Sequence, residues 1–189
     1  MGISDKQLEY LRNLKRKPNE DDIRYKEVIK RRLLKNDIII YLLHNDELEK
    51  NESTNDDYFN DNILPYYLIS PTQTKVKNYL CFETSFDSVS RYNSVIKYQQ
   101  VIFYILCHNS DIDVKEVGVA RHDLIASVLI DEYQGSNIFG TQLKLISDKA
   151  SVVDNNYSAR TLIFEQKTTN SITDASGREF SLRAGSSGR

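Results

Sequence analysis

The sequence has no tryptophan, only two cysteines and no long hydrophobic run among its 189 residues. The longest apolar stretches are Ile38 to Leu43 and Val101 to Cys107. Both fall far short of the roughly 20 residues that a membrane-spanning helix requires. The N-terminus is charged and carries no apolar segment of the kind that secretory signals contain. From these absences we expect a cytoplasmic protein that does not enter a membrane.

The two cysteines do not form a recognisable motif. Cys81 and Cys107 each lie inside an apolar run, which is typical of small buried side chains in a reducing compartment. A disulfide between adjacent strands is the alternative interpretation. Cys107 and His108 are neighbours on a predicted strand, so their side chains would point to opposite faces. They are therefore not expected to bind the same metal ion.

Motifs for metals and phosphates are also missing. There is no CxxC or HxxxH pair, and the glycines at Gly135 and Gly140 are isolated rather than part of a glycine-rich phosphate loop. No nucleophile elbow is present either. We therefore expect no metal, no cofactor and no enzymatic activity.

Charge is balanced, with 25 basic and 27 acidic residues and a net charge of −2. This balance provides no overall field that would attract nucleic acid or an anionic membrane. Basic residues between Arg24 and Lys35 lie near acidic ones and include a single aromatic, Tyr25, which favours a solvated helix face over a phosphate-binding one. The 12 tyrosines suit half-buried strands and protein interfaces.

The pattern along the chain predicts one domain with two extensions. Residues 1–19 are polar and basic and are expected to be an arm or a short helix. Residues 20–170 are expected to be a single α+β domain. Residues 171–189 are rich in Ser, Gly and Arg and are expected to be a disordered tail, of the kind that cloning or read-through adds.

The first half of the domain is expected to be helical. The segment Asn19-Glu-Asp-Asp22, with three acidic residues, favours a helix start, and the helix runs to Lys35. Asn36 then caps a short second helix from Ile38 to His44, although a run this short could equally be a buried strand. Residues 46–62 are acidic and rich in asparagine, which predicts a mobile loop.

The second half is expected to contain the sheet. A helix between Gly118 and Gly135 has one apolar stripe, and four segments are strand-like. The expected fold is therefore an antiparallel or mixed sheet of about four strands packed against one main helix, with an N-terminal helical segment. Polar connections are expected at residues 85–97 and 147–158. The expected strands are Tyr79–Thr84, Gln99–His108, Gln142–Ile146 and Arg160–Lys167.

One group of residues is a candidate for catalysis. Asp148 ends a predicted strand, and the next strand carries Glu165 and Lys167 in a Glu-x-Lys pattern. In restriction-like nucleases, two carboxylates hold Mg²⁺ and a lysine helps to activate water. Glu-x-Lys is also common on solvated strand faces, so a polar strand face is the favoured interpretation and the nuclease is the alternative.

The order of elements and three short segments resemble small structural proteins of tailed bacteriophages. The resemblance covers roughly residues 23–170, and it is to the tail terminator, tail completion and head–tail joining group. The segments are Arg121-His-Asp-Leu-Ile125, Ser136-Asn-Ile-Phe-Gly140 and Arg160-Thr-Leu-Ile-Phe-Glu165.

The resemblance implies a structural virion protein of the neck that forms a homo-oligomeric ring, most commonly a hexamer. Its partners would be copies of itself, the phage connector, and tail tube or sheath proteins. Genomic DNA would pass through without sequence-specific contacts. The group has no catalytic residues, and the connections at 46–62, 85–97 and 147–158 are the expected contact elements. A phage regulator that binds a host protein is a further alternative.

Overall fold

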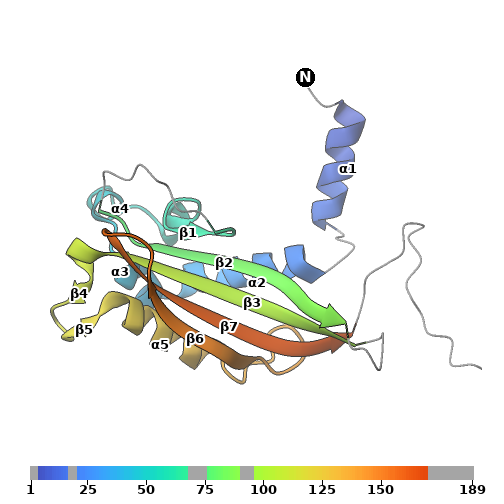
Figure 1. The fold of residues 1–189 in the computed structure, drawn as a ribbon. Helices are drawn as coiled ribbons and strands as arrows, with labels where there is room; N and C mark the ends of the chain where they lie inside the picture. Colours follow the sequence, from blue (N-terminus) through green and yellow to red (C-terminus); the bar gives the residue numbers. More distant parts are fainter. Residues whose placement is uncertain (1–3, 17–20, 68–75, 90–95, 170–189) are drawn as a thin grey trace, which may run out of the picture.

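The computed structural model describes residues 4–16, 21–67, 76–89 and 96–169 (Figure 1). The helices are α1 (Asp5–Arg16), α2 (Asp21–Lys35), α3 (Asp37–Leu43), α4 (Asp46–Lys50), η1 (Asn55–Tyr58), η2 (Asn109–Asp111) and α5 (Arg121–Tyr133). The strands are β1 (Ile63–Leu64), β2 (Tyr79–Val89), β3 (Ile96–His108), β4 (Asp113–Val114), β5 (Val119–Ala120), β6 (Lys144–Val152) and β7 (Tyr157–Thr169).

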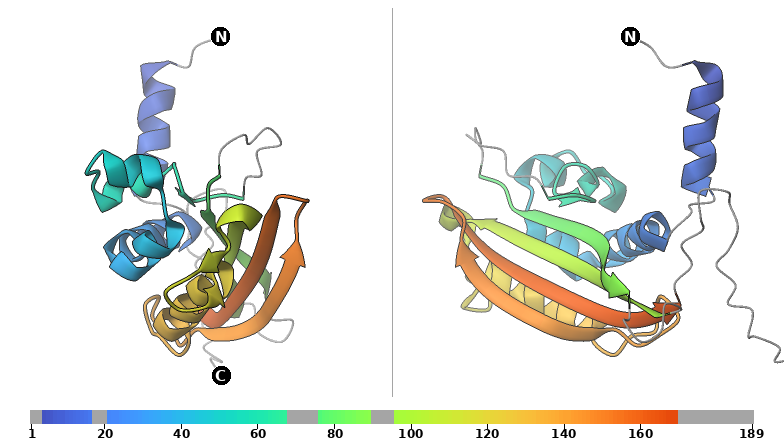
Figure 2. Two further views of the ribbon diagram at one scale, coloured as in Figure 1. Left: turned by 90° about the vertical axis from the view of Figure 1, so that its left-hand side faces the viewer. Right: turned by 45° about the vertical axis from the view of Figure 1, so that its right-hand side comes forward.

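Five strands form one mixed sheet in the order β1-β2-β3-β7-β6. The short β1 runs parallel to β2, and the other neighbours are antiparallel. In Figure 2, α2, α3 and α5 lie on one side of this sheet, while the other side of β3, β7 and β6 faces outward. The expected α+β fold with a mixed sheet is confirmed. β4 and β5 form a separate small hairpin before α5.

Alternation along β3 separates the two faces of the sheet. Val101, Phe103 and Ile105 are fully buried toward the helices, while Ile102 and Tyr104 between them are only half-buried. Period-two alternation is the pattern of a strand with one covered face. The sequence predicted that both faces of this strand would be buried. This is true only toward the end of β3, where Leu106 and Cys107 are also buried and a second small hydrophobic cluster forms.

Helix α5 packs its apolar stripe onto the covered face. Ile125, Leu129 and Tyr133 are fully buried, and the Tyr133 ring packs against Phe103 at a centroid distance of 4.9 Å. Gly135 has φ +75°, so it ends the helix in the left-handed conformation that the sequence predicted.

Helix α3 resolves the uncertainty over the Ile38–His44 run. The Asn36 side chain accepts hydrogen bonds from the backbone N–H groups of Ile38 at 3.1 Å and Ile39 at 3.2 Å, as an N-cap does. The helix buries Ile39, Leu42 and Leu43, so one helical face and not a strand accounts for the run.

The expectation of a mobile loop at residues 46–62 is wrong. Helices α4 and η1 occupy this segment, Tyr58 is buried, and Asn62 is fully buried. Asn45, just before the segment, caps α4 by accepting from the N–H of Glu47 at 3.1 Å and of Leu48 at 3.2 Å. Within the segment, the Asn62 side chain donates to the Asn78 carbonyl at 2.8 Å.

The two other predicted connections are shorter than expected because the strands continue into them. Of residues 85–97, only 90–95 lie outside the described part of the chain, since β2 continues to Val89 and β3 begins at Ile96. Residues 147–158 are mostly strand. The turn between β6 and β7 is tight, and the Asp154 carboxylate accepts from the N–H groups of Asn156 at 2.7 Å and Tyr157 at 2.8 Å.

Cys81 and Cys107 are buried and are not joined by a disulfide, so the disulfide alternative is not adopted. Burial raises the pKa of the Cys107 thiol to about 12. Among the described residues, no helix is both long enough and apolar enough to cross a membrane. The predicted tail at residues 171–189 lies outside the described residues.

Helix α1 confirms a helix within the predicted N-terminal arm. In Figure 1 it projects away from the sheet. Every side chain from Ser4 to Asn13 is exposed, including Leu8, Tyr10 and Leu11. An apolar helix face that stays exposed among the described residues is the most unusual surface of this part of the chain.

Candidate functional site

The structure does not bring the three nuclease candidates together. Asp148 stands opposite Leu162 in the β6–β7 register, and Leu162 is fully buried toward the helices. Glu165 is three residues further along β7, so it points to the outward face, where it stands opposite Lys144. Lys167 shares that outward face. Because its two carboxylates lie on opposite faces of the sheet, this set cannot hold one Mg²⁺ ion.

Asp148 is instead part of an ion-pair group. Its two carboxylate oxygens accept from Arg160 Nε and Nη2, both at 2.7 Å, and Arg160 Nη1 also donates to Asp123 on α5. The hydrogen bonds from Arg160 hold the pKa of Asp148 below its ordinary value of 3.8. The group ties strand β6 to helix α5 through β7.

This lowered pKa predicts how Asp148 contributes to stability across pH. Its contribution is present above the ordinary pKa of 3.8 and is lost as pH falls through the lowered folded-state pKa. The Asp148→Asn variant should therefore melt up to about 3 °C below the unmodified chain at pH 7, since an exposed pair contributes at most about 1 kcal/mol. Thermal melts from pH 2.5 to 7 should show this difference closing as pH falls below 3.8.

Asp131→Asn, on the exposed face of α5, is the matched control for removing one carboxylate. A difference that stayed constant from pH 2.5 to 7 would show that Asp148 acts through packing and not through its charge.

A second group of polar side chains, largely buried, surrounds Asp111. Arg121 is 5% exposed and donates to the Asp111 carboxylate at 2.9 Å, to the Asp111 backbone carbonyl at 2.8 Å and to the Leu42 carbonyl at 2.9 Å. The other Asp111 oxygen accepts from Asn78 Nδ2 at 2.8 Å and from His44 Nδ1 at 2.9 Å. Asp111 therefore joins the end of α3, the start of β2 and the start of α5.

Buried asparagines extend this network. Asn78 also donates to the Leu43 carbonyl at 3.1 Å, and its Oδ1 accepts from the His108 N–H at 3.1 Å. Asn62 donates to the Asn78 carbonyl at 2.8 Å and accepts from Asn45 at 2.6 Å. Each of these side chains satisfies backbone groups where helices and strands end, which is how polar groups are accommodated inside a core.

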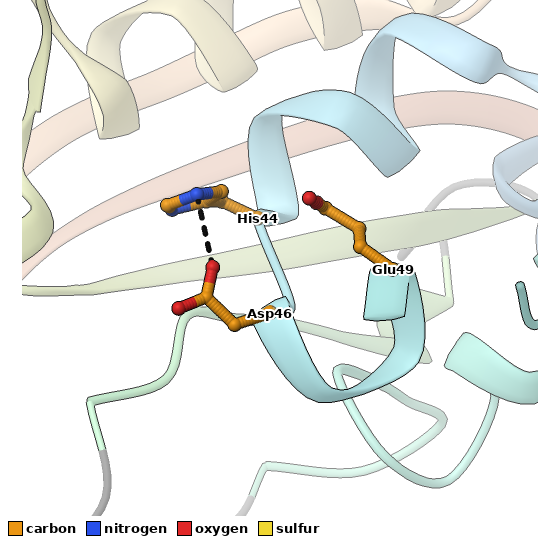
Figure 3. Close-up of side chains that lie close together, drawn as sticks. All are labelled: His44, Asp46 and Glu49. Atoms are coloured by element: carbon orange, nitrogen blue, oxygen red, sulfur yellow. Dashed lines mark ion pairs between the residues drawn. The ribbon is translucent and has the colours of Figure 1, made fainter. Parts of the chain in front are cut away.

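His44 lies where this network reaches the surface. It closes α3 with φ 45° and ψ 81°, a left-handed conformation that is uncommon for a residue with a side chain. Its Nε2 lies 3.4 Å from Asp46 Oδ1, and Glu49 reaches toward both from α4 (Figure 3). One ligand atom from each of the three lies within 4.8 Å of the others. They border clefts that are also lined by Asp111.

Sequence reasoning missed both the Asp111 network and the His44 group. Their members are spread from residue 44 to residue 121 with no repeated spacing. The only available signal was local. Asn45 and Asp46 form an Asn-Asp pair at the start of α4, and His44 is a single histidine directly after the apolar helix α3.

The remaining candidate surfaces are apolar rather than catalytic. On the outward sheet face, Ile102 and Ile163 are direct cross-strand neighbours and are half-buried. Strand β6 is the last strand in the sheet order, and most of its side chains are exposed, including Ile146 and Val152 at 50% and 74%. In the described part of the chain, its outer edge pairs with no other strand.

Comparison with known proteins gives one finding. A protein-family model described as YomW matches residues 36–166, which is more than two thirds of the chain. The match begins at the N-cap of α3 and ends inside β7, so it includes the whole Asp111 network, the His44 group and most of the sheet. No curated protein matches the chain.

Proposed function

This chain belongs to the YomW family, whose name is that of a phage-derived Bacillus protein, and we propose that it is a structural protein of a tailed phage particle. In this proposal it is not an enzyme. It assembles as a homo-oligomeric ring at the head–tail neck, where it terminates, completes or joins the tail. Its other partners are the connector and the tail tube or sheath proteins, and genomic DNA passes the ring without sequence-specific contacts.

The observation that carries the proposal is the exposed apolar face of α1. The helix has 12 residues, and isolated helices of this length are only marginally stable in water. Leu8 and Leu11 are one helical turn apart and are 36% and 50% exposed. A partner that covers these side chains would stabilise the helix. In a ring, that partner is the neighbouring copy of the chain.

The sheet supplies a second, different surface. The exposed edge of β6 and the outward face around Ile102 and Ile163 belong to the sheet, whereas α1 projects from it (Figure 1). When one of these surfaces binds the other on a neighbouring copy, the copies associate head to tail. Such contacts close into rings when the rotation between subunits permits. Lys144 and Lys149 on β6 argue against uncontrolled edge pairing, since charged side chains protect exposed edges.

Mass spectrometry of purified particles tests the virion assignment. Particles of a phage that encodes this chain should contain it in a small, constant number of copies relative to the major capsid protein. The chain should remain with the particles through a density gradient. If it were present in infected cells and absent from the particles, the alternative of a regulator that binds a host protein would replace this proposal.

A further inference from the structure

We propose that His44, Asp46 and Glu49 form a binding site for a divalent transition-metal ion, with Zn²⁺ or Mn²⁺ as the fitting ions. The three side chains converge at the surface between the end of α3 and the short helix α4 (Figure 3). One imidazole nitrogen and two carboxylate oxygens lie within 4.8 Å of one another. An ion placed among them could therefore reach all three after only small side-chain rotations.

The orientation of His44 is the strongest evidence for this site. Its Nδ1 lies 2.9 Å from Asp111 Oδ2, so Nδ1–H donates to that carboxylate and the lone pair of the neutral ring is on Nε2. Nε2 is also the atom that faces Asp46, at 3.4 Å. In metal sites, a carboxylate on the second ring nitrogen fixes the orientation of a liganding histidine and raises its basicity.

The supporting carboxylate is itself held in place from outside the proposed site. Asp111 is fixed by Arg121 at 2.9 Å and by Asn78 at 2.8 Å. Its side chain is only 17% exposed, whereas that of His44 is 40% exposed. A largely buried network thus presents one oriented and accessible ring to the surface.

The backbone brings the two carboxylates to the same side. The left-handed turn at His44 redirects the chain, and Asn45 caps α4, so Asp46 begins the helix beside the imidazole. Glu49 is three residues after Asp46, which places it on the same helical face. Two carboxylates this close repel each other, and a bound dication removes that repulsion.

The donor set selects the class of ion. Mg²⁺ and Ca²⁺ prefer shells made only of oxygen, whereas an imidazole nitrogen suits Zn²⁺, and the two carboxylates also suit Mn²⁺. Three protein ligands leave at least one position of the ion open. In the assembled particle, a side chain of a neighbouring subunit could occupy this position.

Isothermal titration calorimetry with the tag-free full chain tests the site, with ZnCl₂ and MnCl₂ as the probes. One ion should bind per chain. His44→Asn and Glu49→Gln should each weaken binding at least tenfold. Asn tolerates the left-handed backbone at this position.

Glu47→Gln, which removes a carboxylate from the same helix, is the matched control and should leave affinity unchanged. Absence of saturable binding, or equal binding by Glu49→Gln and Glu47→Gln, would overturn the proposal.

Histidine proton NMR gives a readout that does not depend on affinity. The chain has three histidines, so their ring signals can be assigned by single substitutions. Zn²⁺ at one equivalent should shift the His44 signal and leave those of His108 and His122 in place. A shift at His108 or His122 instead would show that the ion binds elsewhere.

Discussion

Replacing Arg121 with methionine should lower the free energy of unfolding by about 3 kcal/mol. Methionine retains an unbranched apolar stem in place of the arginine methylenes, so most of the loss reports on the guanidinium. Without it, the Asp111 carboxylate loses its buried cation, and the backbone carbonyls of Leu42 and Asp111 lose their donors. A buried polar group that loses its partner still pays the free-energy cost of leaving water. Removing one partner therefore lowers stability by more than the net contribution of the intact pair. Urea denaturation followed by circular dichroism measures the change.

Arg31→Met is the matched control, because Arg31 lies on the exposed part of α2 and donates only to the Glu27 carbonyl among the bonds described, at 3.3 Å. It should change stability by less than about 0.5 kcal/mol. Equal losses in the two variants would show that the Asp111 network does not contribute to the fold in the way its geometry indicates.

The double variant Leu8→Glu/Leu11→Glu should convert the assembled protein into monomers while leaving the domain folded. The two leucines are exposed on α1 and are absent from the hydrophobic core of the described residues, so their loss removes no intramolecular packing. Two carboxylates on the face that meets a neighbour would be buried without partners, and that cost exceeds the energy of a contact of this size. Light scattering after size-exclusion chromatography measures the mass, and the melting temperature confirms the fold.

The control for this variant is Lys6→Gln/Asn13→Glu, which changes the net charge by the same amount on the opposite face of α1. This protein should keep the mass of the unmodified chain. If both variants dissociated equally, overall charge and not the apolar face would control association. If neither did, α1 would not be part of the contact.

Structural elements that depend only on neighbouring residues could be predicted from the sequence. The apolar run that marks β3 as a strand, the apolar stripe of α5 and the αL stop at Gly135 depend on local pattern and on one glycine. The run did not reveal that one face of β3 is covered less than the other. The cap at Asn36 was likewise visible as a residue type at a helix start. These features give the α+β class and the central strand.

The errors arise where composition and tertiary context disagree. Residues 46–62 are acidic and polar, yet Asn55 and Asn62 donate to backbone carbonyls and Tyr58 anchors the segment in the core. Composition alone cannot distinguish an asparagine that is solvated from one that caps a helix.

The candidate sites failed or were missed for a related reason. The faces of Asp148 and Glu165 depend on the β6–β7 register, which contains a bulge between Leu145 and Ser147. The one extra residue of this bulge moves the following side chains of β6 to the other face of the sheet, and the sequence does not reveal where a bulge occurs. His44 and Asp111 are 67 residues apart, so only the fold could bring them together.

The mass of the unmodified, tag-free chain in solution is the most direct test of the assembly proposal. Multi-angle light scattering over a hundredfold range of concentration, with negative-stain images of the same fractions, would provide it. The proposal predicts a discrete species of about six times the 21.9 kDa of one chain, seen as rings. A mass of 21.9 kDa at every concentration, with no rings in the presence of the phage tube protein, would contradict it.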